Sequence, residues 1–275
     1  MRFQFGQNWK NYSKHLNEDR IFEAKKDIQN FLELKELKNK TFLDVGCGSG
    51  LSSLAAKRLG AIVTSYDYDV DSVNTAKQLK EKFFKDDNSW KIFKGDVLDE
   101  NFCKNLGQFD IVYSWGVLHH TGDQWKAMEN IKNNIKKDGL MYLALYNNDG
   151  NFKKWLLIKK IYNFLPRYLN IFYALILYIY YEILRQTIIP ILRQTIISKR
   201  PIKYTVKFFK QFKEKYEYKK NRGMSLYFDI IDWYGGYPYE VSTSNEVINF
   251  FKDFEIIKLI KNNSYGNNLF LFKKK

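Results

Sequence analysis

The segment LDVGCGSG, from Leu43 to Gly50, places a glycine-rich turn directly after a short β-rich run and directly before a helical pattern. Because glycine has no side chain, such a turn lets a ligand approach the backbone N–H groups closely. A dinucleotide-binding turn has the spacing G-x-G-x-x-G, but the positions of its last glycine hold Leu51 and Ser53 here. The pattern is G-x-G-x-G, which predicts a nucleotide-like ligand of another kind.

β-rich runs alternate with helical patterns on both sides of this turn, which is typical of a parallel, doubly wound sheet. In such sheets ligands bind beyond the carboxyl ends of the strands, so the residues after each run are the candidates for function. The predicted strands are residues 41–45, 61–67, 90–96, 109–115 and 140–146, and the helices between them include residues 51–60 and 71–84.

The C-terminal part is predicted to complete the sheet. Thr243 stands three residues before Glu246, the spacing of a capping box, and a helix is expected over residues 247–254. Residues 254–261 and 268–275 predict two further strands. The fold class we expect is therefore α/β, with a Rossmann-like, seven-stranded, mostly parallel sheet, an antiparallel C-terminal strand and a helical cap insertion.

The composition is that of a folded protein from a reducing compartment. The 275 residues are 45% hydrophobic, which is enough for a full core. Cys47 and Cys103 are the only cysteines, too few for a disulfide framework. The first residues contain no apolar run of the signal-peptide type. We expect a cytoplasmic location, with peripheral attachment to the inner membrane surface as a second interpretation.

With Asp44 before it, the G-x-G-x-G turn resembles the S-adenosylmethionine (SAM) binding motif of class I methyltransferases. Asp67 ends the second predicted strand about twenty residues downstream, the distance at which a carboxylate accepts hydrogen bonds from both ribose hydroxyls. The resemblance implies that Asp96, after the third strand, contacts the adenine amino group and that Val97 flanks the ring. The implied cofactor-binding residues of this region are Asp44, Gly46, Gly48, Gly50, Asp67, Asp96 and Val97.

The segment SWGVLHHTGD, residues 114–123, begins at the end of the fourth predicted strand. The resemblance places Ser114 against the cofactor and the following residues beside the transferred methyl group. His119 and His120 are candidate general bases, because a neutral imidazole accepts a hydroxyl proton near pH 7. We favour His120, which matches a histidine of quinone and small-molecule methyltransferases, and a structural role of both histidines is the alternative. Amino-group methylases of DNA carry a D/N-P-P-Y-type tetrapeptide where this chain has SWGV, so a nucleic-acid substrate is disfavoured.

Further segments resemble one bacterial methyltransferase family, similar to ubiquinone-type (2-polyprenyl-hydroxyphenol) methylases, over nearly the whole chain. These segments are FQFGQNWKNY (3–12), SWGVLHHTGD (114–123), LALYN (143–147), RGMS (222–225) and DWYGGYPYE (232–240). The resemblance implies that Trp9 and Tyr12 close over the cofactor. The implied acceptor-binding residues are Trp115, Asp232, Trp233, Tyr237 and Glu240. The alternative is that these aromatic side chains anchor a turn on the core, and no metal site is predicted.

The positive charge of the chain is concentrated in one segment. Residues 151–222 hold 17 of the 45 Lys and Arg residues and only three acidic ones, within a chain whose formal net charge is +15. Such a block points to one face with its own partner. We therefore divide the chain into four parts. They are an N-terminal helical segment that closes over the cofactor (1–40), the SAM-binding core (41–150), a basic aromatic cap (151–222) and a C-terminal completion of the sheet with an acceptor-site loop (223–275).

The cap segment predicts helices that do not span a membrane. Residues 171–181 are uninterrupted apolar, but a spanning helix needs about twenty such residues. Residues 204–216 place aromatic side chains at helical spacing, with lysines on the polar face, which predicts a basic amphipathic helix. We favour packing of this helix as a cap, with peripheral membrane contact through residues 203–220 as the second interpretation and RNA binding as the third.

Together these features predict a SAM-dependent methyltransferase that acts on a small-molecule acceptor. The family resemblance implies O-methylation of a sugar-like or phosphorylated metabolite of a surface-glycan or secondary-metabolite pathway, with N-methylation as the alternative. One alternative is a methyltransferase of a lipid-linked or quinone-like acceptor at the membrane face. Another is a non-catalytic SAM-binding or scaffold module.

Overall fold

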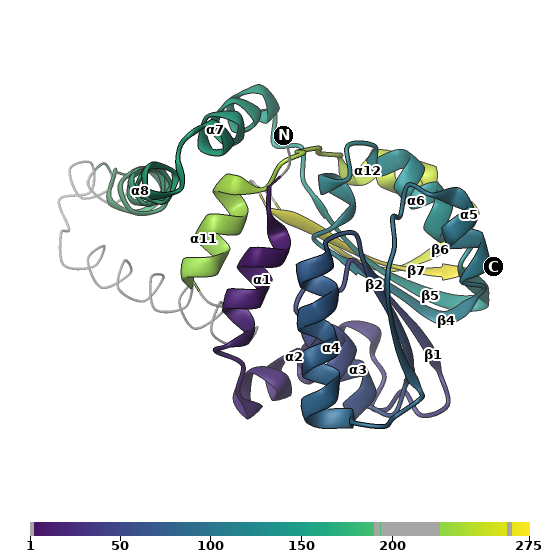
Figure 1. Ribbon diagram of the computed structural model, residues 1–275. Helices are drawn as coiled ribbons and strands as arrows, with labels where there is room; N and C mark the ends of the chain where they lie inside the picture. Colours follow the sequence, from purple (N-terminus) through teal and green to yellow (C-terminus); the bar gives the residue numbers. More distant parts are fainter. Residues whose placement is uncertain (1–2, 190–192, 194–225, 263–265) are drawn as a thin grey trace.

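Within the described part of the chain, seven strands form one sheet with helices on both faces (Figure 1). The computed structural model describes residues 3–189, 193, 226–262 and 266–275. The strand order is β3-β2-β1-β4-β5-β7-β6. The strands are β1 (Thr41–Val45), β2 (Ile62–Asp67), β3 (Trp90–Lys94), β4 (Phe109–Trp115), β5 (Ile135–Tyr146), β6 (Phe254–Ile260) and β7 (Asn267–Lys274).

The pairing of the strands confirms the predicted fold class. β1 pairs in parallel with β2 and β4, β2 pairs in parallel with β3, and β4 with β5. β7 runs antiparallel to both β5 and β6. The chain proceeds outward from β1 to β3 on one side and from β4 to β5 on the other. Ligands of doubly wound sheets bind at the carboxyl ends of the strands beside such a reversal.

Helices connect the strands, and side-chain caps fix where several of them begin. The helices that flank the sheet are α1 (Phe5–Ser13), α2 (Glu18–Leu32), α3 (Leu51–Arg58), α4 (Val70–Phe84), α5 (Glu100–Asn105), α6 (Gln124–Lys132) and α12 (Ser244–Phe250). The predicted capping box is confirmed, because Thr243 accepts a hydrogen bond from the Glu246 N–H while the Glu246 carboxylate accepts one from the Thr243 N–H. α12 ends earlier than predicted because Phe254 already begins β6.

Each face of the sheet has its own apolar core. α1 to α4 lie on one face, where Tyr12, Ile28 and Leu54 are buried, and α5, α6 and α12 lie on the other, where Ile131 and Val247 are buried (Figure 1). The two layers leave the carboxyl ends of β1 to β4 accessible between the loops and α1. The fold therefore positions these strand ends for ligand binding.

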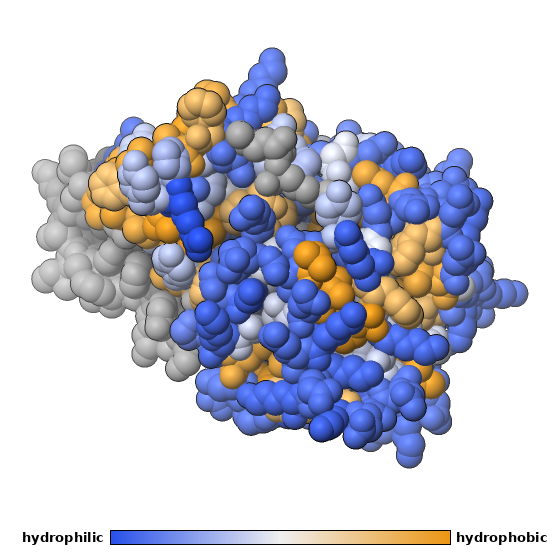
Figure 2. All heavy atoms as spheres, in the orientation of Figure 1, coloured by the Kyte–Doolittle hydropathy of each residue, from blue (hydrophilic) through white to orange (hydrophobic). Residues whose placement is uncertain are grey.

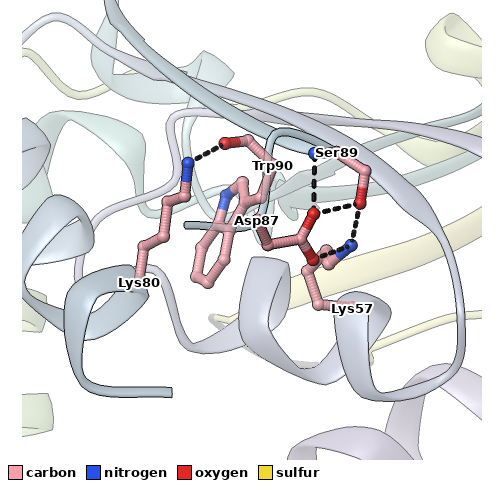
Figure 3. A network of polar contacts seen from close by, with 5 residues as sticks. All are labelled: Lys57, Lys80, Asp87, Ser89 and Trp90. Atoms are coloured by element: carbon pink, nitrogen blue, oxygen red, sulfur yellow. Dashed lines mark hydrogen bonds and ion pairs between the residues drawn. The ribbon is translucent and has the colours of Figure 1, made fainter. Parts of the chain in front are cut away.

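A polar network anchors the opposite end of β3 (Figure 3). Lys57 of α3 forms an ion pair with Asp87 at 2.8 Å, and Asp87 also accepts hydrogen bonds from the backbone and hydroxyl of Ser89. The hydrogen bond from Lys57 is the main reason why the pKa of Asp87 is lowered to about 2. Lys80 of α4 donates to the carbonyl oxygen of Trp90 at 2.7 Å. Because Trp90 begins β3, this network fixes the sheet at the end away from the ligand-binding edge.

The cap is a separate aromatic layer beside the sheet. It consists of α7 (Phe152–Phe164), α8 (Arg167–Tyr178), the π-helical η2 (Ile179–Ile188) and α11 (Leu226–Gly235). Trp155, Tyr162, Ile230 and Tyr234 are buried in its common core. The rings of Tyr12 in α1 and Phe228 in α11 lie 5.9 Å apart, so the cap also contacts the N-terminal helix. The amphipathic helix predicted at 204–216 lies outside the described residues, and no helix within them is long and apolar enough to cross a bilayer.

Candidate active site

The loop between β1 and α3 is held against the end of β2. Gly46 and Cys47 both donate backbone hydrogen bonds to the carbonyl oxygen of Tyr66, at 2.9 and 3.0 Å. Gly46 has a φ of 72°, in the left-handed region that favours glycine. A Cβ atom at Gly46 would lie 2.4 Å from Cγ1 of Val117, in the loop after β4. Gly46 is thus required where the ends of β1, β2 and β4 approach one another closely.

Asp67 at the end of β2 is fixed by two backbone donors. The N–H of Gly48 donates to its Oδ2 at 2.9 Å, and the N–H of Asp69 donates to its Oδ1 at 2.8 Å. Each carboxylate oxygen can accept more than one hydrogen bond. The carboxylate therefore lies between the glycine loop and the start of α4 in a defined orientation.

Helix α1 lies over the glycine loop. The N–H of Gly6 donates to Oδ2 of Asp69 at 2.9 Å, which ties the first turn of α1 to the start of α4. A Cβ atom at Gly48 would lie 3.1 Å from the indole of Trp9. Tyr12 is fully buried, with its ring 5.8 Å from that of Trp9. The structure thus places Trp9 and Tyr12 beside the loop on which the sequence prediction put the cofactor.

Asp44 lies in β1, two residues before Gly46 of the glycine loop, and connects β1 to neighbouring elements. Its carboxylate accepts a hydrogen bond from the Ser53 hydroxyl, which also lies 2.7 Å from the hydroxyl of Ser65. Burial is the largest cause of the rise in the pKa of Asp44 to about 7, and the hydrogen bond from Ser53 opposes this rise. Asp44 therefore helps to join β1, α3 and β2 in addition to lining a cavity.

A cavity of about 370 Å³ lies at the ends of the parallel strands. Asp67 lines it after β2, Asp96 and Val97 line it after β3, and His120 lines it from the segment after β4. Asp96 also accepts a hydrogen bond from the Leu98 N–H at 2.9 Å, which fixes its carboxylate. We call this space the donor cavity. Four of the predicted cofactor-binding side chains meet there although they come from α1, from the end of β2 and from the segment after β3, namely Trp9, Asp67, Asp96 and Val97.

A larger cavity of about 730 Å³ lies beside it, between the glycine loop and the cap. Its walls are rich in aromatic side chains from the ends of β4 and β5, from α8 and from α11. They are Tyr113, Trp115, Tyr142, Tyr146, Tyr178, Trp233 and Tyr234. The two cavities share five lining residues, which are Trp9, Gly46, Trp115, Gly116 and Asp232. We call the larger space the acceptor cavity, and the shared residues mark the junction at which the two spaces meet.

The structure separates the two neighbouring histidines. The backbone N–H of Tyr146 donates to Nδ1 of His119 at 3.1 Å, and the two rings stack with centroids 3.6 Å apart. His119 is fully buried, and burial lowers its pKa well below the usual range. It lines neither of the two cavities. His119 therefore acts as a neutral side chain that joins η1 (Leu118–His120) to the end of β5.

His120 lines the donor cavity in a fixed tautomer. Its Nδ1 lies 2.6 Å from the carbonyl oxygen of Pro238, and because a carbonyl only accepts, Nδ1 carries the proton. This leaves Nε2 as the basic nitrogen. A Cβ atom at Gly236 would lie 2.7 Å from Cε1 of His120, so the glycine lets the acceptor-site loop pack against the ring. Of the two histidines, His120 is thus the one that lines a cavity, with its Nε2 atom buried beneath the acceptor-site loop.

Asp232 stands at the junction of the two cavities with a buried lysine nearby. Its Oδ1 is buried without a hydrogen-bond partner among the described atoms. Burial raises the pKa of Asp232 to about 7, Asp229 adds to this rise and Lys159 opposes it. Lys159 is fully buried and donates to the carbonyl oxygen of Trp233, and its Nζ lies 4.6 Å from the centre of the Trp233 ring. The junction therefore contains the Asp232 carboxyl, which α11 of the cap places there.

The structure brings most of the residues predicted from the sequence into these two cavities. Those that line at least one cavity are Trp9, Tyr12, Asp44, Gly46, Gly48, Asp67, Asp96, Val97, Trp115, His120, Asp232 and Trp233. Those that line neither are Gly50, Ser114, His119, Tyr237 and Glu240. No group of three or more His, Cys, Asp or Glu side chains within the described ranges is arranged to hold a metal ion.

The residues outside the cavities have identifiable structural contacts. Ser114 is fully buried and lies 3.5 Å from the carbonyl oxygen of Val45. A Cβ atom at Gly50 would lie 2.9 Å from that of Ala76, so this glycine allows α3 and α4 to pack. The carboxylate of Glu240 accepts hydrogen bonds from the Gly122 and Gln124 N–H groups. It therefore supports the loop that carries His120.

Two residues of the site were not predicted from the sequence. Asp69 holds α1 in place, and Lys159 lies behind Asp232. Lys159 carries a readable signal, because it follows Trp155 by four residues and precedes Tyr162 by three, on the stripe of α7 that is buried. Lysine is almost never fully buried unless it has a partner, so a lysine on the buried stripe of a helix indicates an internal contact.

A family model described as a methyltransferase domain matches residues 16–174. Two relatives are both named ubiquinone biosynthesis O-methyltransferase. The protein from Glaesserella parasuis serovar 5 (strain SH0165) is 32% identical over 119 residues, which are 43% of this chain and 50% of the relative. The protein from Coxiella burnetii (strain Dugway 5J108-111) is 32% identical over 135 residues, which are 48% of this chain and 55% of the relative. The chain thus spans about half the length of the curated relatives it matches.

Solved structures share the fold at low sequence identity. Magnesium protoporphyrin IX methyltransferase from Synechocystis PCC 6803, solved with bound S-adenosylhomocysteine (SAH), has a TM-score of 0.53 and 12% identity over 94% of this chain and 84% of that chain. A SAM-dependent methyltransferase from Anabaena variabilis ATCC 29413 has a TM-score of 0.53 and 12% identity over 100% of this chain and 98% of that chain. At this identity the likeness establishes the Rossmann-like fold.

Proposed function

Since this chain belongs to the family defined by that methyltransferase domain, we propose that it transfers the methyl group of SAM to a hydroxyl group of a small acceptor. The observation that carries the proposal is the junction of the two cavities. A methyl transfer is an in-line displacement, so the donor and the acceptor have to meet at one point. The five shared lining residues, Trp9, Gly46, Trp115, Gly116 and Asp232, give them such a point.

The donor cavity has the groups that an adenosyl ligand requires. Asp67 offers carboxylate oxygens to the ribose hydroxyls, and Asp96 and Val97 offer an acceptor and an apolar face to the adenine. The glycine loop borders both cavities, Gly46 lining both and Gly48 the larger one, so its backbone is within reach of the amino-acid part. When bound there, SAM supplies a methyl group activated by its positive sulfur.

His120 is the group that we assign to proton removal from the acceptor. The carbonyl of Pro238 fixes the proton on Nδ1, so Nε2 is the nitrogen that would take the hydroxyl proton as the oxygen attacks the methyl carbon, once the acceptor-site loop that packs on the ring gives the acceptor access to it. The new bond is O–CH3, the broken bond is S–CH3, and the proton moves from the hydroxyl to Nε2. Asp232 accepts a hydrogen bond from the acceptor at the junction.

The acceptor class that the cavity favours is an aromatic hydroxyl compound. Tyr113, Trp115, Tyr146 and Trp233 line the cavity, so a planar acceptor held there is surrounded by aromatic side chains. The matched relatives carry names that refer to O-methylation in ubiquinone biosynthesis, which is consistent with this class. Sugar-like acceptors are the second class, because aromatic faces and carboxylates also hold sugar rings and hydroxyls.

Calorimetry with SAH and a product assay test the proposal in two steps. We expect SAH to bind the purified chain, and we expect SAH to be produced from SAM when a catechol-type phenol is supplied. Nucleotide sugars and sugar phosphates form the second arm of the assay. Absence of SAH binding contradicts the proposal as a whole. Binding without turnover of any acceptor, in both wild type and His120→Ala, supports instead the non-catalytic SAM-binding module.

A further inference from the structure

The outer side of the cap carries apolar side chains that the two cavities do not use. On α7 they are Leu157, Ile161 and Phe164, and on α8 they are Tyr168, Phe172 and Ile176. Their spacing of three or four residues places each set on one face of its helix. We call these six residues the cap stripe. Neither cavity is lined by any of them.

The cap stripe is unusually exposed for apolar side chains. Phe164 is 81% exposed, Tyr168 is 74% exposed and Phe172 is 63% exposed. Figure 2 shows hydrophobic residues on the surface over the region where Figure 1 places α7 and α8. Single exposed apolar residues are ordinary, but a continuous set on two neighbouring helices marks an interaction surface. The opposite faces of both helices are buried in the cap core, at Trp155 and Ala174 for example.

The charges beside the cap stripe favour a negatively charged partner. No Asp or Glu occurs between Asn151 and Tyr181, whereas Lys153, Lys160 and Arg167 are exposed on the same helices. Long basic side chains can extend to phosphate groups while their apolar neighbours enter the acyl region of a bilayer. Anionic lipid is the partner that matches both the apolar stripe and the positive charge.

We propose that the cap stripe docks this protein on an anionic lipid bilayer. The cap stripe lies near the acceptor cavity, so docking also affects how an acceptor reaches that cavity. Tyr178 at the end of α8 lines the acceptor cavity, and α8 packs beside α11, which carries Asp232. Docking through α8 brings the acceptor cavity close to the bilayer surface, where an acceptor with a lipid tail reaches it directly. The docking itself does not depend on the proposed methyl transfer.

Vesicle sedimentation tests the proposal with the full-length chain. We expect the wild type to sediment with phosphatidylcholine vesicles that contain about a quarter of phosphatidylglycerol, and less with pure phosphatidylcholine. High salt should weaken the binding, because it screens the basic residues. The double variant Phe164→Glu and Phe172→Glu should lower the partition coefficient at least about tenfold. The matched control is Phe22→Glu on α2, where the phenylalanine is 55% exposed away from the cap, and this variant should bind as the wild type does.

Two readouts keep the outcomes separate. SAH affinity and thermal unfolding report whether the double variant keeps its fold and its donor cavity, so that a loss of vesicle binding is assigned to the surface. The proposal is overturned if the wild type does not bind anionic vesicles, or if Phe22→Glu impairs binding as much as the double variant. It is also overturned if the wild type does not bind vesicles but self-associates, and the double variant no longer self-associates. In that case a second copy of the chain covers the cap stripe. Failure of SAH binding in all variants contradicts the methyltransferase proposal and leaves the docking result valid.

Discussion

The backbone N–H of Gly48 donates a hydrogen bond to Oδ2 of Asp67 at 2.9 Å. This bond joins the glycine loop after β1 to the end of β2. The carboxylate therefore has two tasks, since it orders the loop and also offers acceptor oxygens to the donor cavity. Because the Asp69 N–H donates to the other oxygen, backbone donors on both sides orient the carboxyl group.

Asp67→Ala should weaken SAH binding by roughly a hundredfold or more. The variant loses charge-assisted hydrogen bonds to the ligand, each of which contributes about 1.5–3 kcal/mol, and it also releases the Gly48 N–H. Asp67→Asn keeps one acceptor oxygen and should lie between the two. Asp71→Ala on α4 is the control, because Asp71 lines neither cavity. Calorimetry with SAH measures the three affinities, and equal affinities for Asp67→Ala and Asp71→Ala contradict the assignment.

Gly116→Ala should impair ligand binding without a clash inside the protein. Gly116 has a φ of 74° and Gly107 has a φ of 77°, and an added Cβ atom meets no other atom within 4 Å at either position. Both substitutions therefore carry the same backbone strain, about 1–2 kcal/mol. Gly116 lines both cavities, whereas Gly107 lines neither. We expect equal losses in urea unfolding but reduced SAH affinity and turnover in Gly116→Ala alone.

His120→Ala and His119→Ala should fail in different ways. The first removes the assigned base and should lower kcat by about 10²–10⁴-fold while SAH affinity stays close to that of the wild type. The second leaves the Tyr146 N–H without its acceptor and opens a cavity, which costs about 2–5 kcal/mol of the free energy of unfolding. Turnover and urea unfolding of both variants separate these effects. If His119→Ala is fully stable and His120→Ala fully active, the assignment of the two roles is wrong.

The fold and the donor cavity could be predicted from the sequence because their signals are local. Strand periodicity, the glycine turn and the Thr243–Glu246 spacing each report on a few neighbouring residues, and the structure confirms the sheet and the capping box. Asp67 and Asp96 follow predicted strands, so a parallel sheet necessarily brings them to one edge.

The roles of the histidines and of Asp232 could not be predicted in the same way. His119 and His120 are adjacent in sequence, and they differ through long-range contacts such as those with Tyr146 and with Pro238, the latter 118 residues away. Asp232 and Lys159 come from α11 and α7, and nothing in either segment predicts their proximity. Such features depend on how the cap packs, which local patterns do not encode.

The free energy of unfolding of Asp232→Asn should increase relative to that of the wild type as the pH rises. Burial raises the pKa of Asp232 to about 7, so the folded protein holds a proton that the unfolded chain releases near its ordinary pKa. The stability due to this proton is complete below about pH 4 and is lost as the pH rises through 7. The difference in unfolding free energy between variant and wild type should therefore grow between pH 4.5 and 7.5, by at most about 1.4 kcal/mol per pH unit. Urea unfolding at several pH values measures it.

Asp87→Asn is the matched control for Asp232, because its shift has the opposite sign. The ion pair with Lys57 lowers the pKa of Asp87 to about 2, so the carboxylate is charged in both the folded and the unfolded state above about pH 4.5. The stability that it contributes is present above its ordinary pKa and is lost as the pH falls toward 2. Its difference from the wild type should thus be flat between pH 4.5 and 7.5. A flat curve for Asp232→Asn as well shows that the Asp232 carboxyl is hydrated in solution, and its assigned place at the dry junction of the cavities is then incorrect.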